Sequence, residues 1–174
     1  QRQMCIRDRL NERTRLVSLV HISSALGCCN PLEQVIPAAH ALGALVLVDA
    51  CQSLAHKPID VAGLEVDFLV GSSHKLCGPT GMGFLWARES LLEAMPPFLG
   101  GGEMIQDVFL DHSTWAVLPH KFEAGTPAIG EAVGMGAAIR YLKTVGLEAI
   151  QAWEAQLTRY LFSRLQAIDG VRVL

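Results

Sequence analysis

The chain has 174 residues, of which 51% are apolar and 18% are charged, and its formal net charge is −3. This balance excludes a disordered chain and favours a soluble α/β protein with a sizeable core. No run of like charges and no stretch of about 18 apolar residues occurs, so neither a nucleic-acid face nor a membrane span is predicted.

The five cysteines and the polar N-terminus indicate that the protein works in a reducing compartment. The number of cysteines is odd and no C-x-x-C spacing occurs, which favours free thiols over a disulfide framework or a structural zinc site. The first residues lack the apolar core of a signal peptide. We therefore expect no metal site and a reducing compartment, either the cytoplasm or the plastid stroma.

Strands alternate with helices along the chain. Residues 1–9 lack any periodicity and are interpreted as a foreign or disordered segment. The expected elements then follow in chain order: strand 15–22, helix 30–42, strand 45–49, strand 67–71, strand 84–87, short helix 89–94, helices 128–145 and 147–168, and the start of a strand at 171–174. This order predicts an α/β class with a mostly parallel sheet. The strand at 84–87 is expected to be antiparallel, because no helix precedes it.

Local signals define some element boundaries. Asn30 is expected to cap its helix, with Pro31 in the first turn and Gly43 at the end. The stretch 96–119 is expected to be irregular. Gly134 and Gly136 predict a close backbone contact of their helix.

A carboxylate and a lysine each follow one of the expected strands, at Asp49 and Lys75. Ligands of parallel α/β sheets bind outside the carboxyl ends of the strands. Pyridoxal 5′-phosphate (PLP) needs a lysine for a Schiff base and an acid that holds its pyridine nitrogen protonated. Taken singly, such an aspartate is usually a cap and such a lysine a solvated group. The residues that accompany them here are Gln52, Ser72 and His74, beside a glycine-rich turn.

The segment 73–83 (SHKLCGPTGMG) closely resembles the lysine motif of cysteine desulfurases, which belong to the class V aminotransferases of the fold-type I PLP superfamily. The GPTG form is similar to the SUF-type branch. Further matches are VDACQS at 48–53, MPPFLGGG at 95–102 and FEAGTP at 122–127. The resemblance runs from about Asn11 to Leu174 and covers less than half of a full family member.

The resemblance implies a three-layer α/β/α large domain whose mostly parallel sheet has one antiparallel strand. Residues 10–145 would form part of this PLP-binding domain. Residues 146–174 would lead, through a helix and a strand, into a truncated C-terminal small domain.

The resemblance also implies roles for individual residues. Lys75 would form the Schiff base with PLP and later remove the Cα proton of the substrate. Asp49 would pair with the pyridine N–H, and Gln52 would hydrogen-bond the ring 3′-oxygen. Ser72 and His74 would hold the cofactor phosphate.

Two further positions are carried over from the family pattern. Thr126 would reach the phosphate of the partner subunit's cofactor in a homodimer. It is also predicted to cap the helix that starts at Ala128, which is an anion site in its own right; a cap without ligand is the alternative. Ser24 stands where the family has an asparagine that contacts the substrate, and its side chain is shorter and lacks the amide.

The family's nucleophilic cysteine would lie beyond Leu174, as would the arginines that clamp the substrate carboxylate. The aromatic or histidine side chain that stacks on the cofactor ring would lie before Asn11. Cys51 and Cys77 flank the predicted site but do not match the nucleophile, and both are interpreted as packed or inert thiols.

The implied activity is conversion of L-cysteine to L-alanine with formation of an enzyme persulfide. The persulfide sulfur would pass to an acceptor protein of the SUF system for iron–sulfur cluster assembly. Alternatives left open are a selenocysteine lyase, an aminotransferase-like or kynureninase-like PLP enzyme, and an inactive truncated fragment or a dimerising scaffold without PLP.

Overall fold

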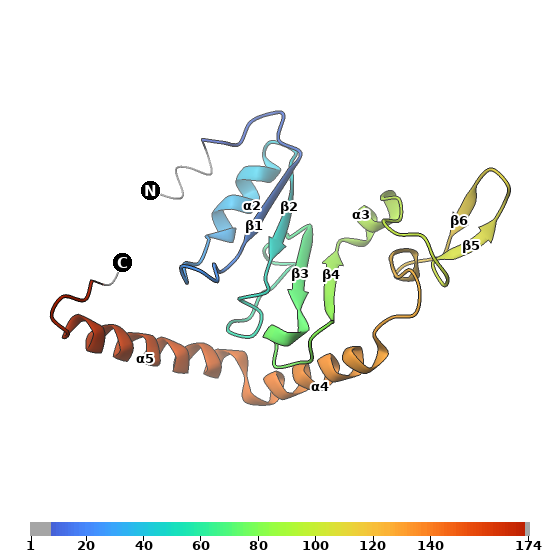
Figure 1. Cartoon of the computed structure of the whole chain (residues 1–174). Coiled ribbons are helices and arrows are strands. Elements are labelled where there is room, and N and C mark those ends of the chain that lie inside the picture. The colour runs from blue at the N-terminus through green and yellow to red at the C-terminus, as the bar shows by residue number, and fades with distance from the viewer. Residues whose placement is uncertain (1–7, 173–174) are drawn as a thin grey trace.

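The computed structural model describes residues 8–172, and a four-stranded sheet lies at its centre (Figure 1). The strands are β1 (Leu16–Val20), β2 (Leu45–Asp49), β3 (Phe68–Ser72) and β4 (Gly83–Ala87), in the order β1-β2-β3-β4. β1, β2 and β3 are parallel, whereas β4 runs antiparallel to β3. The predicted α/β class with one antiparallel strand is confirmed.

One face of the sheet carries the main core. Helix α2 (Leu32–His40) lies on this face, and its apolar side chains pack against alternate residues of β2, because successive strand residues point to opposite faces. Val46 and Val48 are fully buried, while Leu47 and Asp49 on the other face are only half-buried. Strand β2 is therefore buried on one face of the described structure and half-buried on the other. Asp49 belongs to the less covered face.

The start of α2 differs from the prediction. Pro31 occupies the N-cap position, and no side chain caps the helix. Asn30 instead donates a hydrogen bond from Nδ2 to the carbonyl of Val20, at 2.7 Å. The predicted Asn30 cap is wrong, because this amide ties the start of α2 to the end of β1.

A β-hairpin lies in the stretch that was predicted to be irregular. Its strands are β5 (Ile105–Val108) and β6 (Ser113–Trp115), which pair antiparallel. The turn between them is closed by the Phe109 N–H, which donates to the His112 carbonyl at 2.9 Å, and by stacking of the two rings. Figure 1 shows the hairpin projecting away from the central sheet, beyond α3 (Glu89–Ala94).

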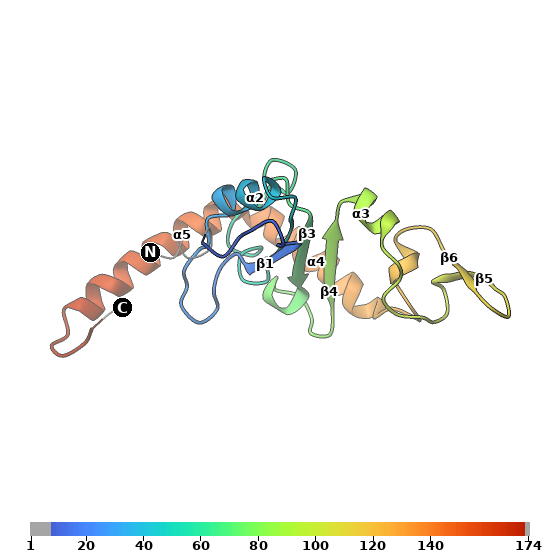
Figure 2. The same ribbon diagram turned by 90° about the horizontal axis from the view of Figure 1, so that it is seen from above.

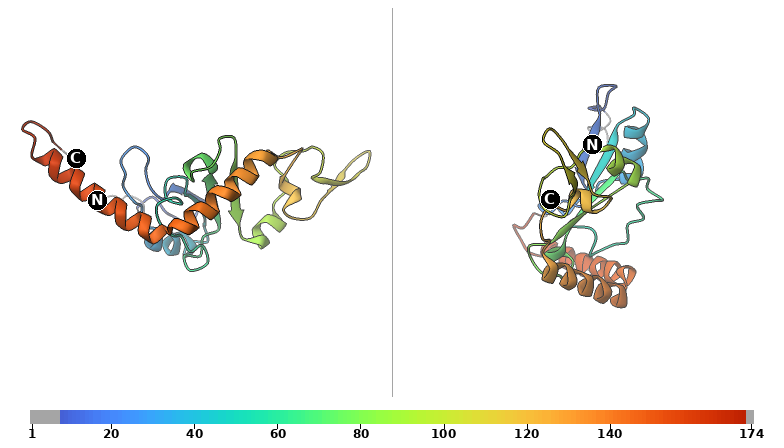
Figure 3. Two further views of the ribbon diagram at one scale, coloured as in Figure 1. Left: turned by 90° about the horizontal axis from the view of Figure 1, so that it is seen from below. Right: turned by 90° about the vertical axis from the view of Figure 1, so that its right-hand side faces the viewer.

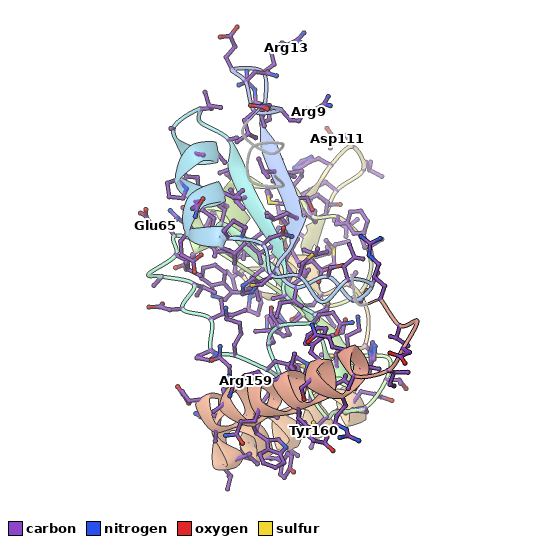
Figure 4. The ribbon with its side chains drawn as sticks, turned by 90° about the vertical axis from the view of Figure 1, so that its left-hand side faces the viewer. Arg9, Arg13, Glu65, Asp111, Arg159 and Tyr160 are labelled. Atoms are coloured by element: carbon purple, nitrogen blue, oxygen red, sulfur yellow. The ribbon has the colours of Figure 1, made fainter. Side chains whose placement is uncertain are left out.

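Two long helices complete the described chain. α4 (Ile129–Val145) passes the carboxyl end of β3, and α5 (Leu147–Gln166) continues past the sheet; Gly146 joins them with a positive φ of 89° (Figures 2 and 3). α5 has no buried residue. Arg159 and Tyr160 on α5 lie at the opposite end of the molecule from Arg9 and Arg13 (Figure 4).

Several predictions about the chain's ends lie partly outside residues 8–172. The segment interpreted as foreign, 1–9, is described only at its last two residues, which form a turn. Of the strand expected at 171–174, the described residues Val171 and Arg172 are not in a strand. Within the described residues, none of the helices has the length and apolarity needed to span a bilayer.

Candidate functional site

Lys75 ends a tight turn at the carboxyl end of β3. The 3₁₀ helix η1 (Ser73–Lys75) follows the strand directly. The Ser73 carbonyl accepts the N–H groups of Leu76 at 2.8 Å and Gly78 at 3.0 Å, while the Ser73 N–H donates to the Met82 carbonyl at 2.9 Å. These three backbone bonds hold the lysine just outside the sheet edge, where ligands of α/β folds bind.

Helix α4 packs directly against this turn. A Cβ on Gly134 would lie only 2.9 Å from Cγ of Pro79, so the helix backbone packs directly on the turn. A Cβ on Gly78 would collide with the buried Ser73 side chain, whose Oγ has no partner among the described residues. The predicted close contact is confirmed at Gly134, whereas Gly136 would meet only Arg140 of its own helix, at 3.6 Å.

Asp49 and Ser72 face the same side of the sheet. In the register of β2 with β3, Asp49 pairs with Val70, so the residues two positions on, Cys51 and Ser72, lie beside each other. The Cys51 Sγ and the Ser72 Oγ are 3.1 Å apart and hydrogen-bonded. The Cys51 N–H donates to Oδ1 of Asp49 at 2.9 Å. Cys51 therefore links the acid of one strand to the hydroxyl of the next.

Burial and neighbouring groups shift the pKa of Cys51. Burial raises the pKa of this thiol, and the negative charge of Asp49 acts in the same direction. The hydrogen bond with Ser72 and the positive charge of Lys75 partly oppose the increase in pKa.

The other predicted site residues are distributed as follows. Gln52 is half-buried directly after Cys51, and His74 is exposed beside the half-buried Lys75. Across residues 8–172, the side chains of Gln52, His74 and Lys75 form no hydrogen bond, so their polar atoms are available to a ligand. Ser24 is exposed in the loop after β1.

Thr126 lies apart from this group. Its side chain is exposed and lines a cavity of about 200 Å³ with Glu103, His120 and Glu123. Ala128, not Thr126, occupies the N-cap position of α4, and no side chain caps that helix. The predicted Thr126 cap is wrong, because the helix begins two residues later than a cap at Thr126 requires.

Sequence reasoning missed the contribution of Cys51. The prediction of a packed thiol is consistent with its partial burial, but its position between Asp49 and Ser72 was not anticipated. The sequence carried no signal for it, because the contact with Ser72 depends on how β2 and β3 pair. Cys51 lies in the turn that follows β2, so the two-residue alternation of the strand does not extend to it.

Comparisons with known proteins identify the family of the chain. The class-V aminotransferase family model matches residues 2–174. A probable cysteine desulfurase of Synechocystis sp. (strain ATCC 27184 / PCC 6803 / Kazusa) is 57% identical over 164 residues, which is 94% of this chain and 39% of the relative.

Two solved structures share the fold. The cysteine desulfurase CsdA from Escherichia coli superposes with a TM-score of 0.92 at 36% identity, over 97% of this chain and 42% of that one. A variant of C-DES with glycine covalently linked to its PLP cofactor gives a TM-score of 0.85 at 27% identity, over 96% and 45%. The chain thus spans about two fifths of the length of these relatives. With this lysine turn, this sheet and a family match over almost its whole length, the chain belongs to the class-V aminotransferase family.

Proposed function

We propose that this chain provides the PLP-binding centre of a cysteine desulfurase. The observation that carries the proposal is that Asp49 ends β2 and the turn with Lys75 follows the adjacent parallel strand β3, with Cys51 hydrogen-bonded to both Asp49 and Ser72. The likeness to the Synechocystis and E. coli proteins supports the choice of reaction.

The donor set fits the cofactor. PLP presents a ring nitrogen that carries a proton, an aldehyde and a phosphate. The Asp49 carboxylate has Oδ2 available beside the Oδ1 that accepts the Cys51 N–H, so it can accept the ring proton. Ser72 and His74 supply donors for a phosphate next to the lysine, and Gln52 supplies an amide for the ring 3′-oxygen.

Each residue then has a chemical task. Lys75 Nζ anchors the cofactor and afterwards takes the proton from Cα of L-cysteine. Asp49 keeps the proton on the ring nitrogen, because its negative charge stabilises the positive ring. When bound, PLP supplies an electron sink for the electrons released at Cα. Ser24, in the loop after β1, is a candidate contact for the substrate.

The sulfur chemistry requires a thiolate, which Cys51 is poorly suited to provide. Burial raises the pKa of Cys51, which favours its protonated and less nucleophilic form. We therefore assign the persulfide-forming cysteine to a region outside this chain. Its sulfur would pass to an acceptor protein of the SUF type, and L-alanine would be the second product.

The assembly and the compartment belong to the same proposal. The enzyme would act as a homodimer in which Thr126 reaches the partner subunit's cofactor phosphate, consistent with its exposed position. Among the described residues, Cys29, Cys51 and Cys77 form no disulfide, which suits a reducing compartment such as the cytoplasm or the plastid stroma.

Borohydride trapping tests the proposal. The full-length protein encoded by the gene is incubated with PLP, reduced with borohydride, digested and mapped by mass spectrometry. We expect a pyridoxyl label on Lys75, its loss in Lys75→Arg, and its retention in the matched Lys57→Arg variant. A label on another lysine, or none in the wild-type protein, would contradict the proposed function.

A further inference from the structure

We propose that Cys51 is a positioning residue, which holds the Ser72 hydroxyl so that its proton points to the cofactor phosphate. This inference rests on the proposed function, because it concerns the same cofactor. It assigns a role to a thiol that the desulfurase reaction itself does not use.

The argument starts from how many hydrogen bonds Ser72 can form. A serine hydroxyl has one donor hydrogen and two acceptor lone pairs. Its only side-chain hydrogen bond within residues 8–172 is to Cys51 Sγ, at 3.1 Å. If the thiol donates to Ser72 Oγ, the serine proton stays available to an anion. If the serine donates to sulfur, that proton is consumed.

A phosphate bound beside Ser72 would select the first arrangement. Burial and the nearby Asp49 carboxylate raise the pKa of the thiol, so sulfur carries its proton at neutral pH and can donate it. A phosphate bound near Ser72 would favour the same direction, because only the serine O–H can then satisfy the phosphate oxygen. The thiol and the anion thus orient the serine hydroxyl cooperatively.

Cys51 also holds the acid of the site. Its backbone N–H donates to Oδ1 of Asp49 at 2.9 Å, while its side chain contacts Ser72. The backbone bond persists in any substitution except proline. Side-chain variants of Cys51 therefore test the link to Ser72 while the bond to Asp49 is maintained.

The experiment compares two ligands that differ by the phosphate. Dissociation constants of PLP and of pyridoxal are measured by absorbance titration for the full-length wild-type protein, Cys51→Ala, Cys51→Ser and Cys77→Ala. Cys77 is an exposed thiol two residues from Lys75 and serves as the matched control. We expect Cys51→Ala to weaken PLP binding about threefold, the size of one weak hydrogen bond, with pyridoxal binding unchanged. Cys51→Ser, which keeps a donor, should restore the affinity.

A double-mutant cycle separates positioning from packing. In a Ser72→Ala background, Cys51→Ala should cause no further loss of PLP affinity, because the residue through which it acts is gone. Any one of four results would overturn the inference. These are an equal loss of affinity for PLP and pyridoxal, no loss of PLP affinity, additive losses in the double-mutant cycle, and no rescue by Cys51→Ser. If the wild-type protein forms no adduct on Lys75, the proposed function fails first, and the inference fails with it.

Discussion

His21 lies one residue beyond β1, next to the end of β2, and its backbone N–H donates to the Asp49 carbonyl at 2.8 Å. The side chain is only 4% exposed, and Nδ1 has no partner among the described residues. Burial lowers the pKa of His21 below its ordinary value of 6.5, and the positive charge of Lys57 acts in the same direction, opposed by Glu33. The folded protein therefore favours neutral His21.

This shift predicts a pH dependence of stability. Because the pKa is lower in the folded state, the unfolded chain binds more protons below the ordinary pKa of 6.5. The free energy of unfolding should be largest above that pH and decrease as the pH is lowered through it. Urea titrations at several pH values should show this decrease, and His21→Gln should make it smaller. An unchanged slope in His21→Gln would refute the assignment.

The two thiols beside Lys75 should differ in reactivity. Burial raises the pKa of Cys51, whereas Cys77 is exposed. Since the thiolate is the nucleophile, Cys51 should be alkylated by iodoacetamide more slowly than Cys77 at neutral pH. Its rate should continue to increase with pH above the range in which an ordinary thiol is fully ionised. Time-resolved peptide mass spectrometry gives both rates in one sample, and equal rates would contradict the prediction.

Secondary-structure elements are held together by a charged cluster at the amino ends of β2 and β3. Asp67 is 3% exposed; its Oδ2 accepts from the Val46 N–H and lies next to His40 Nε2, both at 2.8 Å. Arg88, after β4, places Nε 3.3 Å from Oδ1 and donates from Nη2 to the Glu65 carbonyl. One buried carboxylate thus connects α2, β2, β3 and β4.

Removal of this carboxylate should destabilise the sheet without affecting the lysine turn. Asp67→Ala leaves a buried N–H and two basic groups without their acceptor, so we expect a loss of about 3 kcal/mol in the free energy of unfolding. The exposed Asp111→Ala should stay within about 0.5 kcal/mol of wild type. Urea denaturation measures both. Pyridoxyl labelling of folded Asp67→Ala should still map to Lys75, and failed labelling would show that the two ends of the sheet are coupled.

Two glycines of α4 form a matched pair for testing helix packing. A Cβ at Gly134 would press on the rigid ring of Pro79, whereas one at Gly136 would meet only the flexible Arg140. We expect Gly134→Ala to destabilise the protein by about 1 kcal/mol through overpacking. Gly136→Ala should stabilise it by about 0.5–1 kcal/mol, because alanine favours the helix. Thermal unfolding of both variants checks the opposite signs, and two changes of the same sign would contradict the packing described.

Elements with strong local signals were predicted well, and those defined by tertiary contacts were not. The strand 45–49 and the helix 89–94 match the structure to the residue, because their apolar pattern and flanking residues are local. The hairpin of β5 and β6 was missed, since four- and three-residue strands carry too little alternation to detect. The group around Asp49 and Lys75 was predicted from strand ends, but the bridge through Cys51 requires the register between strands, which one sequence does not provide.

Helix α5 exposes several large apolar side chains to an unusual extent. α5 has no buried residue, yet several of its aromatic and aliphatic side chains are about half exposed or more: Trp153 (61%), Leu157 (49%), Tyr160 (65%) and Leu161 (54%). Soluble proteins rarely leave such a patch uncovered. The length of the relatives is more than twice that of this chain.

We therefore expect this chain, expressed alone, to self-associate through α5. Light scattering coupled to size-exclusion chromatography should give a mass that increases with protein concentration. Leu161→Glu should reduce the association, and Arg159→Gln on the same helix, which also lowers the net charge by one, serves as a control for the charge. A monomeric mass at every concentration would refute the prediction.

The charged cluster around Asp67 and the turn that ends at Lys75 lie at opposite ends of the same strand, β3. This separation has an evolutionary consequence. Substitutions at the amino ends of the strands can tune thermal tolerance, and those at the carboxyl ends can tune the reaction, with little interference between the two. A library of substitutions at the amino ends of the strands should yield variants with altered heat resistance. A library at the carboxyl ends should yield variants with altered chemistry.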